Sequence, residues 1–270
     1  MKVACGGGVH VESESRGEDG GRSRDRLHAR DLVVDRATGD VSGTGPGRLT
    51  STRLGQQPLM ASPPGPPGLA AQPVSAPRPA AGLNYLGVDF QRGLRGNIHR
   101  RTMEFHQRVE AVWGPVAGWD DTLDPHAAAG LPEGVVTVSS DVLGVGQVPP
   151  APGGTRPTIE LAAAGNVLVE GESFTGRSAR LTWAEAKDLL VFEGDGRSDA
   201  QLFRQLQAGA QPSSASAGKI LLWRSQNRVD VEDARYLDLD QLRGGPAPTL
   251  PAPQRPRGPA GPPARSLPST

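Results

Sequence analysis

The chain has 270 residues, with 36 glycines, 26 prolines and only 4% aromatic residues, so part of it lacks the apolar side chains that a packed core needs. Lysine plus arginine equals aspartate plus glutamate at 29 each, which argues against nucleic acid or an anionic membrane as the main partner. The single cysteine, Cys5, excludes an intramolecular disulfide and a zinc site built from cysteines.

Composition divides the chain into four segments. Residues 1–55 and 83–243 hold short apolar runs that are typical of strands, and they are predicted to be a first β block and a main β block. Residues 56–82 and 244–270 are rich in proline, glycine and alanine. They are therefore predicted to be a linker and a disordered tail. We expect the two β blocks to share one sheet, because neither has many apolar residues of its own.

The first block is predicted to be a series of short strands, at residues 2–4, 9–12, 27–35, 41–42 and 49–53. Gly39 ends a turn where a positive φ is needed. No signal peptide is recognised, and no stretch reaches the roughly 20 apolar residues of a membrane span. Because the sequence after Met1 already has the pattern of a repeat interior, we hypothesise that it begins inside a longer protein.

The main block continues with alternating apolar residues, which favour strands over helices. Strands are predicted at residues 85–90, 102–113, 135–143, 158–162, 167–170, 174–183, 189–193, 220–223, 229–231 and 234–239. Residues 144–157 are predicted to be a loop. Residues 198–206 are predicted to form a short helix, because Leu202, Phe203 and Leu206 fall at helical spacing.

Two clusters of polar residues could carry chemistry. His99 and His106, with Glu104 between them, suggest a metal site, but on a strand the two histidines point to opposite faces. Asp120, Asp121 and Asp124 could supply paired carboxylates for acid–base catalysis. Their glycine- and alanine-rich surroundings favour a solvated loop. We therefore expect no enzyme, no metal and no cofactor.

Three segments of the main block resemble the repeat of the OstA-like (LptA-like) family of bacterial envelope proteins. They are Ala164-Gly-Asn-Val-Leu-Val-Glu-Gly171, Ala179-Arg-Leu-Thr-Trp183 and Asp188-Leu-Leu-Val-Phe-Glu-Gly194. Further copies resemble it around 29–43, 96–112 and 220–239. The resemblance implies stacked antiparallel strands in a β-jelly-roll or folded β-taco. It also implies a role in lipopolysaccharide transport or outer-membrane assembly, in the periplasm or cell envelope of a diderm bacterium.

In that family the inner faces of the strands hold lipid acyl chains, and the strand edges join neighbouring molecules. The positions of this chain that match the lipid-contacting strands are Val167, Val169, Leu181, Trp183, Leu190, Phe192 and Leu222. The ordinary alternative for these residues is a packed core. Three functions stay open. They are a non-enzymatic envelope protein that binds lipid or associates through β-edges, a structural or protein-interaction β-repeat module without a ligand groove, and an enzyme using the aspartates above.

Overall fold

The computed structural model describes residues 1–16, 22–54, 82–127, 131–148, 158–205, 213–223, 226 and 228–238. Within them the chain is all-β, with strands that pair antiparallel in one 16-stranded sheet. The described residues hold one helical turn, the 3₁₀ turn Glu185–Lys187. The predicted tail and all of the predicted linker except Gly82 lie outside the described residues.

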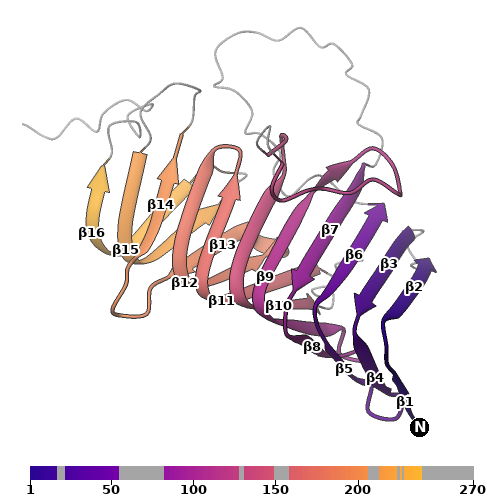
Figure 1. The fold of residues 1–270 in the computed structure, drawn as a ribbon. Coiled ribbons are helices and arrows are strands. Elements are labelled where there is room, and N and C mark those ends of the chain that lie inside the picture. Colours follow the sequence, from indigo (N-terminus) through magenta and orange to yellow (C-terminus); the bar gives the residue numbers. More distant parts are fainter. Residues whose placement is uncertain are drawn as a thin grey trace, which may run out of the picture.

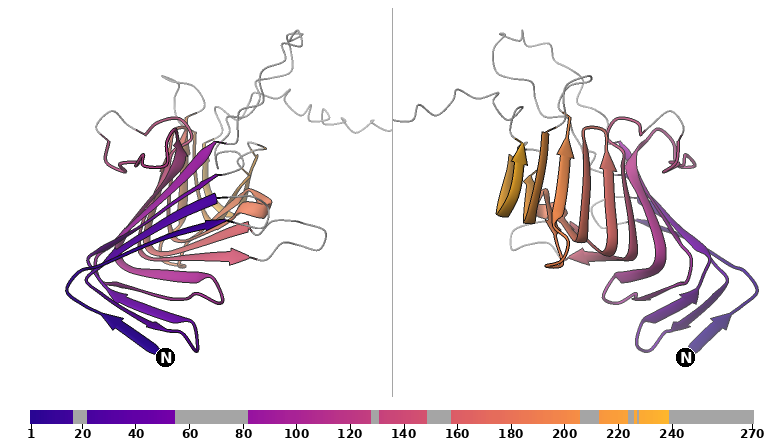
Figure 2. Two further views of the ribbon diagram at one scale, coloured as in Figure 1. Left: turned by 90° about the vertical axis from the view of Figure 1, so that its right-hand side faces the viewer. Right: turned by 60° about the vertical axis from the view of Figure 1, so that its left-hand side comes forward.

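The sheet folds into two layers that meet along one side and diverge from it (Figure 2). Layer A runs through β1, β4, β5 and β8, one half each of β9 to β12, then β13 and one half each of β15 and β16. Layer B runs through β2, β3, β6 and β7, the other halves of β9 to β12, then β14 and the other halves of β15 and β16. Each step along the stack thus adds one strand, or one half of a long strand, to each layer. Figure 1 shows the stack from β1 and β2 at one end to β16 at the other.

The bounds of the strands are as follows. The strands before the long undescribed segment are β1 (Lys2–Cys5), β2 (Val9–Arg16), β3 (Arg22–Ala29), β4 (Asp31–Asp35), β5 (Asp40–Thr44) and β6 (Gly47–Leu54). Those after it are β7 (Leu83–Phe90), β8 (Gly93–Asn97), β9 (Thr102–Val116), β10 (Val136–Val148), β11 (Thr158–Gly171), β12 (Phe174–Ala184), β13 (Leu189–Glu193), β14 (Ala200–Arg204), β15 (Ser213–Trp223) and β16 (Arg228–Asp238).

The corner between the layers is made in two ways. In β9 and β11 a single strand bends through residues with positive φ, namely Gln107 and Arg108 in β9 and Gly165 and Asn166 in β11. Before β9, separate strands of the two layers are joined by short links at the same corner, such as Arg30 between β3 and β4. Backbone hydrogen bonds continue across these links, with the Arg30 amide donating to the Thr44 carbonyl at 2.9 Å.

The two β blocks share one sheet, as expected. β6 pairs with β7 over their whole length, and β5 pairs with β8. The inward side chains of both layers form one hydrophobic core, which continues from Ala29 in β3 to Leu222 in β15.

Three predictions about local structure are wrong. Residues 27–35 form two strands in different layers, because the chain turns the corner at Arg30. Residues 144–148 extend β10, since Gly144 and Gly146 pair with Ala162 and Glu160 of β11. The predicted helix at 198–206 is instead β14. Its Ala200 and Leu202 alternate into the core, and neighbours on both sides, β12 and β15, satisfy its backbone.

Candidate functional site: the interior and the two ends of the stack

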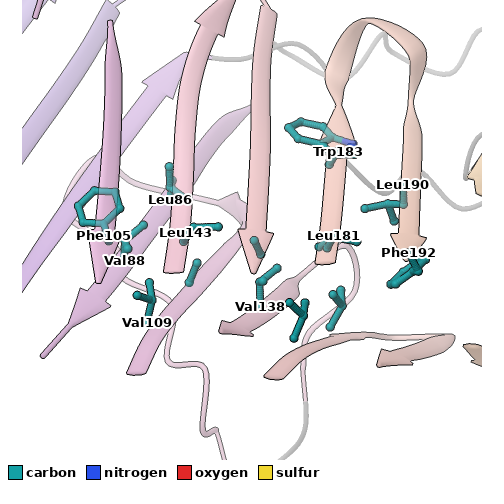
Figure 3. Packing of buried hydrophobic residues seen from close by; sticks show 14 of the residues in the cluster. Leu86, Val88, Phe105, Val109, Val138, Leu143, Leu181, Trp183, Leu190 and Phe192 are labelled. Carbon is teal, nitrogen blue, oxygen red and sulfur yellow. The ribbon is translucent and has the colours of Figure 1, made fainter. Parts of the chain in front are cut away.

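The seven residues matched to lipid-contacting positions all face one interior. Their exposed fractions run from 0% for Val169 and Phe192 to 6% for Leu190, and all belong to the same core cluster. The strands that carry them are neighbours in the sheet, and Figure 3 shows Leu181, Trp183, Leu190 and Phe192 side by side among the other buried residues. The structure therefore brings together three strand faces that the sequence could place only separately.

Aromatic side chains fill the space between the layers. Phe90 of β7 and Phe105 of β9 lie with ring centroids 5.5 Å apart, and both are at most 1% exposed. Trp113 in the layer B half of β9 meets Trp183 in the layer A half of β12 edge-to-face, also at 5.5 Å. Because the indoles touch across the two layers, they close the interior at this place.

The two tryptophans carry an unusual polar feature. The indole nitrogens Nε1 of Trp113 and Trp183 are both buried, and neither has a hydrogen-bond partner among the residues that the structure describes. A buried donor without an acceptor costs free energy, and most such groups in folded proteins find a partner. Sequence reasoning did not single out Trp113, because its partner comes from a strand about 70 residues away.

The ends of the stack are strands with a neighbour on one side only, within the described residues. β1 pairs with β4, β2 pairs with β3, and β16 pairs with β15. These strands also carry exposed large apolar side chains, at Val3 (38%), Val11 (40%), Tyr236 (56%) and Leu237 (42%). An unpaired strand edge with apolar side chains can accept a strand from another chain.

A strap crosses the outer face of layer B. It comprises the described residues 117–127 and 131–135 between β9 and β10, and its Leu123, Leu131 and Val135 form an apolar cluster with Tyr85 and Val112 of layer B. Asp120 in the strap accepts hydrogen bonds from Arg24 at 2.9 Å and Arg26 at 3.1 Å, both on β3. Hydrogen bonding to Glu12 and then to Asp120 raises the pKa of Arg26 above its ordinary value.

The three aspartates considered as alternative catalytic groups all lie in the strap and all have structural partners. Asp120 makes the ion pairs described above. Asp121 accepts the backbone N–H of Gly118 at 2.7 Å, and Asp124 accepts that of His126 at 2.9 Å. Each carboxylate thus has a structural partner.

The two histidines lie apart from one another, and only His106 lies beside Glu104. His106 Nε2 is 2.8 Å from Glu104 Oε1, whereas the His99 ring lies beside Gly39 at the turn after β4. Among the residues that the structure describes, no group of three or more histidine, cysteine, aspartate or glutamate side chains could hold a metal ion.

A further depression that sequence reasoning missed lies on layer A. Its volume is about 680 Å³, and its lining comes from β8 to β13 and the turn at Lys187. The only signal in the sequence was a set of very small residues at outward strand positions, namely Gly144, Gly146, Ala162 and Ala184.

The chain was compared with protein-family models and with curated proteins. The chain matches no protein-family model, and no curated protein shows significant similarity to it. The resemblance to OstA-like proteins therefore stays a prediction. In the described part of the chain, no helix is long and apolar enough to cross a membrane.

Proposed function

We propose that this protein is a non-enzymatic scaffold of the bacterial cell envelope that associates through the strand edges at the two ends of its stack. The observation that carries the proposal is the pair of ends themselves, where β1, β2 and β16 have one neighbour each among the described residues and expose Val3, Val11, Tyr236 and Leu237. Strand addition at such edges satisfies backbone groups and buries apolar side chains together.

The repeat pattern and the two-layer stack support a folded β-taco of the OstA-like kind. A cell-envelope location, a periplasmic one in a diderm bacterium, follows from the same resemblance. The packed interior favours the scaffold over a protein with an open lipid groove, because the seven candidate contacts already have protein neighbours.

The test replaces the apolar edge residues by lysine. Wild-type protein is expected to form a concentration-dependent series of oligomers in sedimentation velocity, and Val3→Lys combined with Leu237→Lys is expected to stop that series. Ile98→Lys is the matched control, because Ile98 is 50% exposed but lies in the turn after β8, away from both ends. A series that survives the edge replacements, or none in the wild type, contradicts the proposal.

A second function, binding of a lipid, is favoured by the two unpartnered indole N–H groups. In this hypothesis the acyl chain of a lipid enters the interior and moves the two tryptophan rings aside. An ester, hydroxyl or phosphate oxygen of the same lipid, at the mouth of the interior, then accepts hydrogen bonds from both indole N–H groups. Native mass spectrometry of protein purified from a diderm envelope tests this. Trp119, which lies in the strap beside Arg22, provides the control. A bound lipid mass that falls in Trp113→Phe/Trp183→Phe but not in Trp119→Phe supports lipid binding, and a clean apo mass contradicts it.

A further inference from the structure

The outer face of layer B carries a pair of histidines at the first end of the stack. His10 on β2 and His28 on β3 are direct partners in the antiparallel register, and both are exposed. Their chain neighbours Val9 and Leu27 pack against the core from the other face, so the two imidazoles point outward. Figure 1 shows β2 and β3 side by side at this end of the stack.

The two imidazole rings contact each other. Their centroids lie 5.3 Å apart, with the ring planes at 72°. Direct partners on antiparallel strands have Cβ atoms about 4.5–5.5 Å apart, so the two side chains leave the sheet next to one another. Within the described residues, no hydrogen bond or ion pair occupies either ring. The ring nitrogens of this pair are therefore available to a ligand.

The spacing of the rings suits a shared metal ion. An imidazole nitrogen binds Zn²⁺ at about 2.0–2.1 Å, so two nitrogens on one tetrahedral ion lie roughly 3.3 Å apart. The centroids are 5.3 Å apart, and the nitrogens of each ring lie on its rim. Because both side chains are exposed, rotation about their torsions can bring one nitrogen of each ring to that separation.

The other histidines have different surroundings. The chain has five histidines. His106 and His126 each lie within 2.9 Å of a glutamate carboxylate, and His99 lies in the turn after β8. Among the described residues, only His10 and His28 place two imidazoles in contact.

The cations near the pair have partners of their own. Arg26, on the same face of β3, is bound by two carboxylates at 3.1 Å each. Arg48, opposite His28 on β6, donates to a tyrosine hydroxyl and lies 3.7 Å from Asp89. Arg30, at the corner, is exposed, and solvent and salt screen its charge. The local charge is thus balanced enough to accept a metal ion.

We infer that His10 and His28 bind one divalent transition-metal ion of the zinc type between β2 and β3. Imidazole is a preferred ligand of Zn²⁺, Ni²⁺ and Cu²⁺, whereas Mg²⁺ and Ca²⁺ prefer oxygen ligands. The described residues hold no metal cluster of three or more side chains, so water fills the remaining positions. The sequence-based expectation of no metal considered His99 and His106. It did not consider this pair, which only the strand register brings together.

The bound ion clips an edge strand to its neighbour. Within the described residues β2 pairs with β3 alone, and it is exposed along nearly its whole length. A metal that binds both strands stabilises the paired state, because the separated strands do not offer the two nitrogens together. We therefore expect the metal to slow the opening of this end and to leave the middle of the stack unchanged.

The experiment uses the full chain without an affinity tag, and with Cys5→Ser to remove the one thiol that could bind the same metals. Isothermal titration calorimetry near neutral pH is expected to show one site per chain for ZnCl₂ and for NiCl₂, and none for MgCl₂. His10→Gln and His28→Gln should each weaken binding about tenfold or more, since each removes one of two protein ligands. His126→Gln is the matched control and should bind as the parent does, because His126 is exposed but lies beside a glutamate.

Amide hydrogen exchange supplies the second readout. Zn²⁺ should slow exchange in β2 and β3 of the parent and should not slow it in His28→Gln. Unchanged exchange in β10 and β11 shows that each variant is folded. A parent that binds no Zn²⁺, binding that survives both glutamine replacements, or a bound metal that leaves exchange in β2 unchanged overturns the inference. Edge association is measured separately by sedimentation velocity in metal-free buffer, so neither result decides the other.

Discussion

The first strands of the stack and its middle strands are held by different forces. β1 is exposed along its whole length and β2 along nearly all of it, and the core residues contributed by β3 to β5 are Ala29, Leu32 and Val41. The middle strands from β7 to β13 bury Phe90, Leu94, Phe105 and Phe192 almost completely.

Ion pairs take the place of a core at the first end. Glu12 and Glu14 on β2 face Arg22, Arg24 and Arg26 on β3, with Arg24 and Arg26 also bound by Asp120. The hydrogen bond from Arg24, followed by that from Arg22, lowers the pKa of Glu14. Exposed ion pairs contribute little free energy each and are screened by salt, so this end is expected to open well before the middle of the stack.

The largest expected effect comes from the core of the middle strands. Phe192→Ala should lower the free energy of unfolding by about 3–5 kcal/mol, because it removes a fully buried ring and leaves a cavity. Val11→Ala on β2 should change it by less than about 0.5 kcal/mol, since Val11 is 40% exposed. Urea unfolding measures both, and equal losses would show that the two regions share one core energetically.

A smaller effect is expected at the corner. Asn166 bends β11 with φ of 49°, and its side chain donates to Asp141 at 2.8 Å. Asn166→Ala should cost roughly 1–2 kcal/mol, because alanine is strained in the left-handed region and cannot donate, whereas Asn166→Gly should cost less. Arg30→Ala, at the link between β3 and β4, is the control and should be nearly neutral in the same urea titration.

Asp120→Asn is expected to act locally. It weakens two exposed ion pairs, so the global free energy of unfolding should fall by less than about 1 kcal/mol. Amide hydrogen exchange in β2 and β3 should nevertheless become faster, and exchange in β10 and β11 should not change. The difference between variant and wild type should shrink at high salt; an effect that persists in 1 M salt would rule out ion pairing as its cause.

The smallest effects concern pH, and they have opposite signs in the two regions. Desolvation raises the pKa of Asp89 on β7, against the opposing effect of Arg48, so the folded state favours the proton and loses stability as pH rises through this raised pKa. Asp40 on β5 has a lowered pKa, chiefly through hydrogen bonding with Thr38 and then Asn97. Its contribution is present above the ordinary value of 3.8 and is lost as pH falls through the lowered pKa.

Asn variants at the two positions test these signs. Asp89→Asn should be more stable than wild type near neutral pH, with an advantage that shrinks as pH falls toward 3.8. Asp40→Asn should be less stable than wild type near neutral pH, and this deficit should shrink below 3.8. Thermal unfolding measured across this range checks both, and shifts of the same sign would contradict the assignment.

The sequence by itself determined the all-β class and most of the strands, because alternation of apolar and polar residues is a local property that the pairing of strands preserves. Trp183 and Phe192 were candidates through the resemblance to the OstA-like repeat, which left open which strand faces point inward, and the structure buries both. The short helix at 198–206 was wrong for the converse reason, since Leu202 and Phe203 fit two periods locally and only the flanking strands β12 and β15 decide between them.

Tertiary structure alone decided where the chain changes layer and which distant residues meet. Leu27 and Val33 belong to one predicted strand, 27–35, yet they lie in different layers because the corner falls at Arg30. Trp113 meets Trp183 and Asp120 meets Arg24 only because the folded sheet brings together segments that lie far apart in the chain. Strand register and corner position depend on long-range pairing, which no local pattern of residues encodes.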